Sequence, residues 1–317
     1  ETEKNVSIAE AKKQNQQKIF FAIGFILAGL LALFVFKNLR VKQRVNTIIT
    51  KQKLEVEHQK ELVEEKNKEI LDSITYAKRI QTAILPPTRI VKEYLPNSFI
   101  IYKPKDIVAG DFYWMENINN KILFAAADCT GHGVPGAMVS VICNNSLNRS
   151  VKEYAISDAG KILNKTREIV IQEFEKSDEE VKDGMDISLC VLDNKTNILN
   201  WAGANNPLWI IRKNKTEIEE IKANKQPIGK QINSEPFTTH TINLNEGDTF
   251  YIFTDGFADQ FGGGQGKKFK SSKMKELLIS IQHENMDNQK IIIDKTFEDW
   301  KGNLEQVDDV CVIGVRV

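Results

Sequence analysis

The chain has 317 residues and a balanced charge, with 43 lysine and arginine side chains against 43 aspartate and glutamate side chains. A balanced chain has no long-range field that would recruit nucleic acid, so we expect no nucleic-acid partner. The four histidines and four cysteines show no paired metal-ligand spacing, which argues against a zinc site, and the scattered cysteines are typical of reduced thiols.

The N-terminal part of the chain predicts a membrane span. Residues 1–18 are polar, and because the chain begins with Glu rather than Met we expect them to be the end of a missing upstream region. Residues 19–36 are apolar without interruption, close to the roughly 20 residues that cross a bilayer as a helix. A secretory signal is the alternative, but the apolar run lies far from the start and lacks a convincing cleavage site. Basic residues crowd its C-terminal flank, which favours a cytoplasmic location for the rest of the chain.

Residues 37–87 predict a long helical linker. No Gly or Pro occurs between positions 38 and 85, and Pro86-Pro87 then ends the helix. One row at intervals of seven residues is apolar, comprising Ile49, Val56, Val63, Ile70, Ala77 and Ile84. The companion row is mostly polar, comprising Asn46, Lys53, Lys60, Asn67, Ile74 and Gln81. We expect a marginal two-stranded coiled coil and therefore a homodimer, with a solvated single helix as the alternative.

Residues 88–317 are long enough for one domain with a sizeable core. Apolar and β-branched runs predict strands over 98–102, 121–127, 187–192, 198–202, 208–212, 217–221 and 249–254 and from 309 onwards. Helices are expected over 135–154, 158–176, 271–282 and 288–300. The Gly-rich residues 262–268 lack the spacing of a P-loop, so we expect a mobile surface loop there. Hairpin-like strands with helices between them predict an α+β fold, a mainly antiparallel sandwich with its helices outside.

Four acidic sites lie at the ends of predicted strands. Asp128 follows a buried run and precedes a Gly-rich turn; Asp255 follows another such run; Asp308 and Asp309 open the last strand; Asp111 precedes an aromatic run. Each one alone fits a turn, because Asp and Gly favour turns. Taken together they indicate a site for hard divalent cations, which bind several oxygen ligands.

The motifs around these residues resemble a known family. The matching segments are Gly110-Asp-Phe-Tyr-Trp, Ala127-Asp-Cys-Thr-Gly-His-Gly-Val-Pro-Gly-Ala, Asp183-Gly-Met-Asp-Ile-Ser, Trp201-Ala-Gly-Ala-Asn-Asn-Pro, Phe253-Thr-Asp-Gly and Asp308-Asp-Val. In this order, over about residues 95 to 317, they resemble the metal-dependent serine/threonine phosphatases of the protein phosphatase 2C (PP2C) superfamily. The branch they resemble is that of the bacterial stage II sporulation protein E.

The resemblance implies a β-sandwich of two antiparallel sheets flanked by helices, with two Mn²⁺ or Mg²⁺ ions between the sheets. Asp128 would bridge both ions, the backbone carbonyl of Cys129 would complete the shell, and Asp255 and Asp308 would be direct ligands. Asp111 would hold a metal-bound water, and Asp183 matches a third, looser metal site from which the sequence does not separate Asp186. Cys129 stands where many relatives have Gly, and Cys311 where Thr is usual. Neither change removes a carboxylate, so an active enzyme is expected.

The implied activity is hydrolysis of phosphoserine or phosphothreonine on a protein by metal-activated water. This chemistry needs no side-chain nucleophile, and the sequence has no recognisable Ser-His-Asp arrangement. His132 could protonate the leaving oxygen, but a turn histidine that bonds the backbone fits the position equally well, so it is left out of the catalytic set. By analogy the substrate is a phosphoprotein such as an anti-sigma-factor antagonist, met at the cytoplasmic face of the inner membrane.

Two other classes of protein remain as alternatives. A membrane sensor histidine kinase also has a membrane helix, a coiled coil and a catalytic domain. However, the linker offers only His58, which lacks the sequence context of a phosphoacceptor, and no Asn-rich nucleotide box is evident. A non-catalytic interaction module is the second alternative.

Overall fold

One long helix dominates the N-terminal part of the structure, a computed structural model that describes residues 2–176 and 182–317. This helix, α1 (Thr2–Ile84), contains both the apolar run and most of the predicted linker, and it ends just before Pro86-Pro87 as expected. The chain divides into two units, Glu1–Leu71 and Asp72–Val317, and α1 contributes to both.

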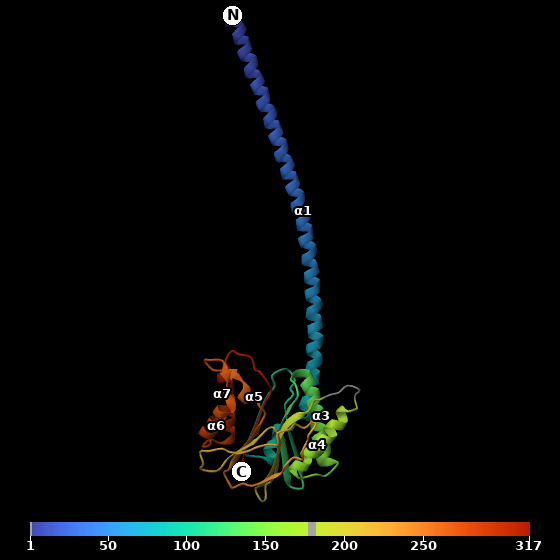
Figure 1. Ribbon diagram of the computed structural model, residues 1–317, viewed down its shortest axis with the longest axis vertical. Helices are drawn as coiled ribbons and strands as arrows, with labels where there is room; N and C mark the ends of the chain where they lie inside the picture. The colour runs from blue at the N-terminus through green and yellow to red at the C-terminus, as the bar shows by residue number, and fades with distance from the viewer. Residues whose placement is uncertain (1, 177–181) are drawn as a thin grey trace. The chain divides into compact units, whose positions relative to one another are not determined.

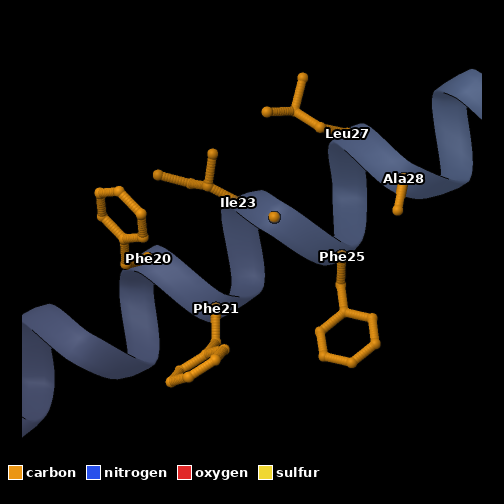
Figure 2. A pocket seen from close by; sticks show the side chains of 7 residues that line it. Phe20, Phe21, Ile23, Phe25, Leu27 and Ala28 are labelled. Atoms are coloured by element: carbon orange, nitrogen blue, oxygen red, sulfur yellow. The ribbon is translucent and has the colours of Figure 1, made fainter.

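The apolar stretch of α1 is long and hydrophobic enough to cross a membrane, with a mean hydropathy of 2.9, and none of it is buried within the chain. Figure 2 shows part of this stretch, where the side chains of Phe20, Phe21, Phe25 and Leu27 extend away from the helix. They border a shallow apolar hollow of about 430 Å³. A helix surface of this kind is stable in lipid but not in water.

The second unit is built on two five-stranded sheets, and all of their strand pairs are antiparallel. Sheet I has the order β1 (Ser98–Lys103), β12 (Val310–Arg316), β9 (Thr249–Phe253), β6 (Leu208–Ile211) and β7 (Glu219–Ile221). Sheet II has the order β2 (Phe112–Ile118), β3 (Lys121–Cys129), β4 (Met185–Asp193), β5 (Ile198–Ala204) and β8 (His240–Asn243).

The sheets pack face to face, and helices cover their outer faces. Between the sheets lies a core that includes Phe124 and Phe250, whose ring centroids are 6.1 Å apart. Helices α3 (Gly133–Lys152) and α4 (Ala159–Phe174) cover sheet II. Helices α6 (Lys270–Ser280) and α7 (Met286–Lys301) cover sheet I on the opposite side (Figure 1). The expected sandwich of two antiparallel sheets flanked by helices is confirmed.

Several elements were not expected from the sequence. They are α2 (Thr88–Tyr94), the strands β2 and β8, and the short helix α5 (Gly256–Asp259). The Gly-rich segment 262–268, predicted as a mobile surface loop, lies at the surface and includes a short hairpin of β10 (Phe261–Gly262) and β11 (Lys267–Lys268) that the sequence did not predict. The four cysteines are buried and free, in agreement with reduced thiols.

Candidate active site

Asp111 and Asp128 come from neighbouring strands of sheet II. Phe112 pairs with Ala127 in the antiparallel register of β2 and β3, so the next residues outward, Asp111 and Asp128, lie opposite each other. Their carboxyl groups are close enough that each acts on the pKa of the other. Asp111 also accepts a hydrogen bond of 2.6 Å from the hydroxyl of Thr254, which follows β9 of sheet I. The two sheets therefore meet at this pair of carboxyl groups.

Asp255 and Asp308 are contributed by sheet I. Asp255 lies just after the end of β9 and Asp308 just before the start of β12, and these two strands are antiparallel neighbours. A Cβ on Gly256 would overlap the backbone carbonyl of Asp309 and would come within 3.3 Å of the Asp308 Cβ. Only glycine permits this approach, which explains why Gly follows Asp255.

The backbone carbonyl of Cys129 lies beside the segment that carries Asp111. A Cβ on Gly110 would lie 3.1 Å from the Cys129 oxygen and would overlap the carbonyl of Gly131. The absence of a side chain at Gly110 therefore lets the turn after Asp128 pack directly on the start of β2. Glycine is therefore needed in this region for close packing of the backbone as well as for backbone conformation.

Burial and mutual repulsion raise the pKa values of these carboxyl groups. Burial, followed by repulsion from Asp255, Asp308 and Asp186, raises the pKa of Asp128 to about 8. Burial and the neighbouring Asp128 raise the pKa of Asp111 well above its ordinary range. The pKa of Asp255 is raised by burial and then by Asp308, against a small opposing effect of Lys268. The site therefore holds more negative charge than its protein neighbours offset.

An excess of clustered carboxylates, of which Asp111 is buried, has the donor chemistry of a site for hard divalent cations such as Mg²⁺ or Mn²⁺. Within residues 2–176 and 182–317, no three His, Cys, Asp or Glu side chains are arranged to hold one ion as they stand. The residues thus fit such ions by ligand type and uncompensated charge, and their side chains have to turn toward an ion to bind it.

Asp186, rather than Asp183, joins the acidic group. Asp186 lies directly opposite Asp128 in the register of β3 and β4, and its charge acts on both Asp128 and Asp255. Asp183 lies before the start of β4, next to Gly184, whose carbonyl accepts a hydrogen bond from the Thr130 amide. Among the described residues, the charges that mainly raise the pKa values of Asp128 and Asp255 include that of Asp186 but not that of Asp183. We call Asp111, Asp128, Asp186, Asp255 and Asp308 the acidic cluster.

Asp309 has a different task from its neighbour Asp308. Its buried carboxylate accepts hydrogen bonds of 2.7 Å from the backbone amides of Lys105 and Gly110, and so it fixes the segment that leads to Asp111. The sequence predicts Asp308-Asp309 only as one acidic site. Nothing in the sequence distinguishes the two residues, because their roles follow from the strand register.

His132 lies at the exposed rim of the site, in the turn after β3. Its Nδ1 is 2.9 Å from a carboxylate oxygen of Asp106, and its Nε2 is 3.2 Å from the ammonium group of Lys105. The side chain therefore contacts two other side chains. Lys105 and Asp106 were not predicted as site residues, because in the sequence they form an ordinary charged pair between a predicted strand and Asp111.

Comparison with known proteins agrees with this architecture. The family model for stage II sporulation protein E (SpoIIE) matches residues 119–317. The structure is similar to the SiaA-PP2C domain of Pseudomonas aeruginosa, with 30% identity and a TM-score of 0.72 over 79% of this chain and 98% of that domain.

Two other solved structures share the fold. The phosphatase domain with a fragment of the regulatory domain of SpoIIE from Bacillus subtilis is 20% identical, with a TM-score of 0.56 over 70% of this chain and 63% of that one. The RsbU and RsbW domains of Rv1364c from Mycobacterium tuberculosis are 17% identical, with a TM-score of 0.56 over 70% of this chain and 60% of that one. Comparison with curated proteins gave no match.

The paired sheets, the flanking helices and the carboxylates at their shared edge define a PP2C-type serine/threonine phosphatase, an enzyme class that depends on Mg²⁺ or Mn²⁺. The chain belongs to the SpoIIE family. Both alternatives considered from the sequence, a sensor histidine kinase and a non-catalytic module, are therefore wrong.

Proposed function

We propose that this protein is a membrane-anchored signalling phosphatase that hydrolyses phosphoserine or phosphothreonine on a protein substrate with the help of two bound divalent cations. The observation that carries the proposal is the acidic cluster, in which carboxylates from both sheets converge with little neutralising charge. A binuclear centre would offset that charge, and two cations are the usual means of activating water against a phosphoryl group.

Asp128 occupies the central position of the cluster and would bridge the two ions. Asp255 and Asp308, together with the Cys129 backbone carbonyl, would be direct ligands, and Asp111 would act through a water. Asp111 is well suited to a fixed role because Thr254 holds its carboxylate from the opposite sheet. For a third ion, Asp186 is the better candidate, although Asp183 was expected from the sequence.

When bound, the ions would activate water and neutralise the phosphoryl oxygens during in-line displacement. The protein would supply positioning: Asp309 fixes the segment before Asp111, and Gly256 keeps Asp255 beside Asp308. His132 lies at the rim in contact with Asp106, where a substrate could reach it.

Membrane attachment would use residues 19–36, with the phosphatase domain of residues 88–317 in the cytoplasm and residues 37–87 as a dimerising linker. The support for this arrangement is the unburied apolar stretch of α1 and the basic flank that follows it. The substrate would be a phosphoprotein, for which an anti-sigma-factor antagonist is the candidate that the family resemblance implies.

The proposal is tested by replacing ligands without changing their size. Asp128→Asn and Asp255→Asn should each reduce Mn²⁺-dependent hydrolysis of p-nitrophenyl phosphate at least about 100-fold while the domain stays folded, because each removes a charged ligand. Asp299→Asn is the matched control, since Asp299 is an exposed residue of α7 paired with Lys295. Near-normal turnover of either site variant at saturating Mn²⁺ would contradict the assignment.

A further inference from the structure

The β10–β11 hairpin and the start of α6 border a second hollow, with a volume of about 330 Å³. Lys267, Lys268, Lys270 and Lys273 line it together with Trp300. We call this feature the basic hollow. It lies in the Gly-rich segment for which the sequence predicted only a mobile loop.

Most of the positive charge around the basic hollow has no acidic partner. Lys268 is paired with Asp259, with 2.7 Å between nitrogen and oxygen, and the ammonium group of Lys273 lies 3.9 Å from the centroid of the Trp300 ring. Among the described residues, Lys267, Lys270 and Lys273 form no ion pair with a carboxylate. Three exposed positive charges around one concave surface favour an anionic ligand.

The basic hollow is held in place by hydrogen bonds to buried groups. The amide of Gly263 donates to the Trp300 carbonyl at 2.8 Å, and the Trp300 indole donates to the carbonyl of Gln260 at 3.1 Å. The amide of Phe269 donates to the same Gln260 carbonyl at 2.9 Å. The backbone of the hollow is therefore preformed, so that ligand binding has to order only the lysine side chains.

The same elements connect the basic hollow to the acidic cluster. Asp255 immediately precedes α5, and Asp259 at the end of α5 holds Lys268, whose charge reaches the Asp255 carboxylate. The buried side chain of Gln260 donates to the carbonyl of Glu305 and accepts from the amide of Val307, in the segment that leads to Asp308. The basic hollow therefore flanks the side of the cluster that Asp255 and Asp308 form.

We propose that the basic hollow binds acidic residues that flank the phosphorylated residue of the protein substrate, so that the enzyme prefers phosphorylation sites in acidic segments. This inference rests on the proposed function, because it extends the substrate site of the same phosphatase. The basic hollow is connected to Asp255 and Asp308 through α5 and Gln260. This connection favours a segment of the substrate, rather than an anionic membrane surface, as the ligand. Lysines on flexible stems suit this role, because they attract carboxylates without requiring one fixed geometry.

The test uses the full chain with Mn²⁺ and two phosphoserine peptides of equal length, one with Glu and Asp around the phosphoserine and one with Gln and Ser. The parent protein should show a higher kcat/KM for the acidic peptide, and the difference should shrink as salt is added. In the triple variant Lys267→Gln, Lys270→Gln, Lys273→Gln, the ratio of kcat/KM for the acidic peptide to that for the neutral peptide should fall about ten-fold. The fall should come chiefly from a higher KM for the acidic peptide.

The matched control is the triple variant Lys121→Gln, Lys195→Gln, Lys215→Gln. Lys121 is the first residue of β3, and Lys195 and Lys215 lie in connections between strands. All three are at the ends of the sheets away from Asp128 and Asp255, and the control should keep the full preference. The inference is overturned if the parent hydrolyses p-nitrophenyl phosphate but does not distinguish the peptides, or if the hollow variant keeps the preference. It is also overturned if the hollow variant loses only its binding to phosphatidylserine vesicles. No hydrolysis of any phosphoester by the parent would instead refute the proposed function.

Discussion

Neighbouring aspartates of identical chemistry have different surroundings in this site. Asp308 lies against Asp255 and accepts one hydrogen bond, from the adjacent Asp309 amide at 2.8 Å, whereas Asp309 accepts hydrogen bonds from the amides of Lys105 and Gly110 in a distant segment. A carboxylate that accepts amide hydrogen bonds contributes to stability, while a carboxylate crowded by others destabilises the metal-free fold. The same substitution at the two positions should therefore have different effects.

Asp309→Asn should lower the free energy of unfolding by about 2 kcal/mol, because one charged acceptor is replaced by an amide that repels one of the two N–H donors. Asp308→Asn should leave stability unchanged or improve it, and should abolish Mn²⁺-dependent phosphatase activity, because it relieves repulsion but removes a proposed ligand. Urea unfolding and turnover at saturating Mn²⁺ measure the two effects separately. Equal losses of stability in both variants would contradict this division of roles.

The sequence was sufficient to predict Asp111, Asp128, Asp255 and Asp308 as one group, because each lies at one end of an apolar or aromatic run. It could not distinguish Asp183 from Asp186. That distinction depends on the register of β4 against β3, which places Asp186 opposite Asp128, and a shift by one residue would turn the opposite set of side chains to this face. Thr254 was missed for a related reason, since its hydrogen bond joins two sheets.

At the scale of elements, both edge strands of sheet II were missed, although the edge strands β1 and β7 of sheet I were predicted. β2 and β8 are the two edges of sheet II, and both were missed, whereas the central strands β3, β4 and β5 were predicted. A central strand is buried on both sides and is therefore a continuous apolar run. An edge strand is more exposed, and β2 accordingly contains Glu116 and Asn117 among its apolar residues. The mixed composition of β2 therefore gave no clear strand pattern.

The C-terminal end of α1 is joined to the active-site segment by one buried side chain. The Gln81 amide donates to the carbonyl of Ala109 at 2.5 Å and to the Ser140 hydroxyl at 3.0 Å, and it accepts from the Ala109 amide at 3.1 Å. Ala109 lies two residues before Asp111. The helix end is thus coupled to the backbone that positions one of the proposed ligands.

Gln81→Leu should lower the free energy of unfolding by about 1–3 kcal/mol, because it leaves the buried amide and carbonyl of Ala109 without a partner. The Mn²⁺ concentration required for half-maximal activity should rise as well, because Asp111 is less firmly held. Gln59→Leu in the exposed part of α1 is the control and should change neither quantity. If Gln81→Leu alters stability alone, the contact supports the fold without positioning the site.

At the scale of the whole molecule, the linker exposes a row of apolar side chains, as the predicted membrane span before it also does. In the single chain, Ile49, Val56, Val63 and Ile70 are each more than half exposed along one row of α1. The companion row contains Asn46, Lys53, Lys60 and Asn67, which weaken a coiled coil. A dimer formed along these rows would be marginal, and a signal of a few kcal/mol could change its arrangement.

The variant Lys60→Leu, Asn67→Leu should convert this marginal seam into a stable one. Two apolar residues replace polar ones in the companion row, so the dimer should persist at protein concentrations about ten-fold or more below those that the parent requires. If the linker regulates the enzyme, locking its arrangement should also shift specific activity, because the helix leads to Gln81 and through it to the Asp111 segment.

Lys51→Leu, Glu65→Leu is the control, since it adds the same apolar surface on the opposite face of the heptad pattern. Sedimentation and phosphatase assays on the full chain measure the two effects. A tighter dimer whose specific activity and Mn²⁺ affinity equal those of the parent and the control would mean that the linker is only a tether.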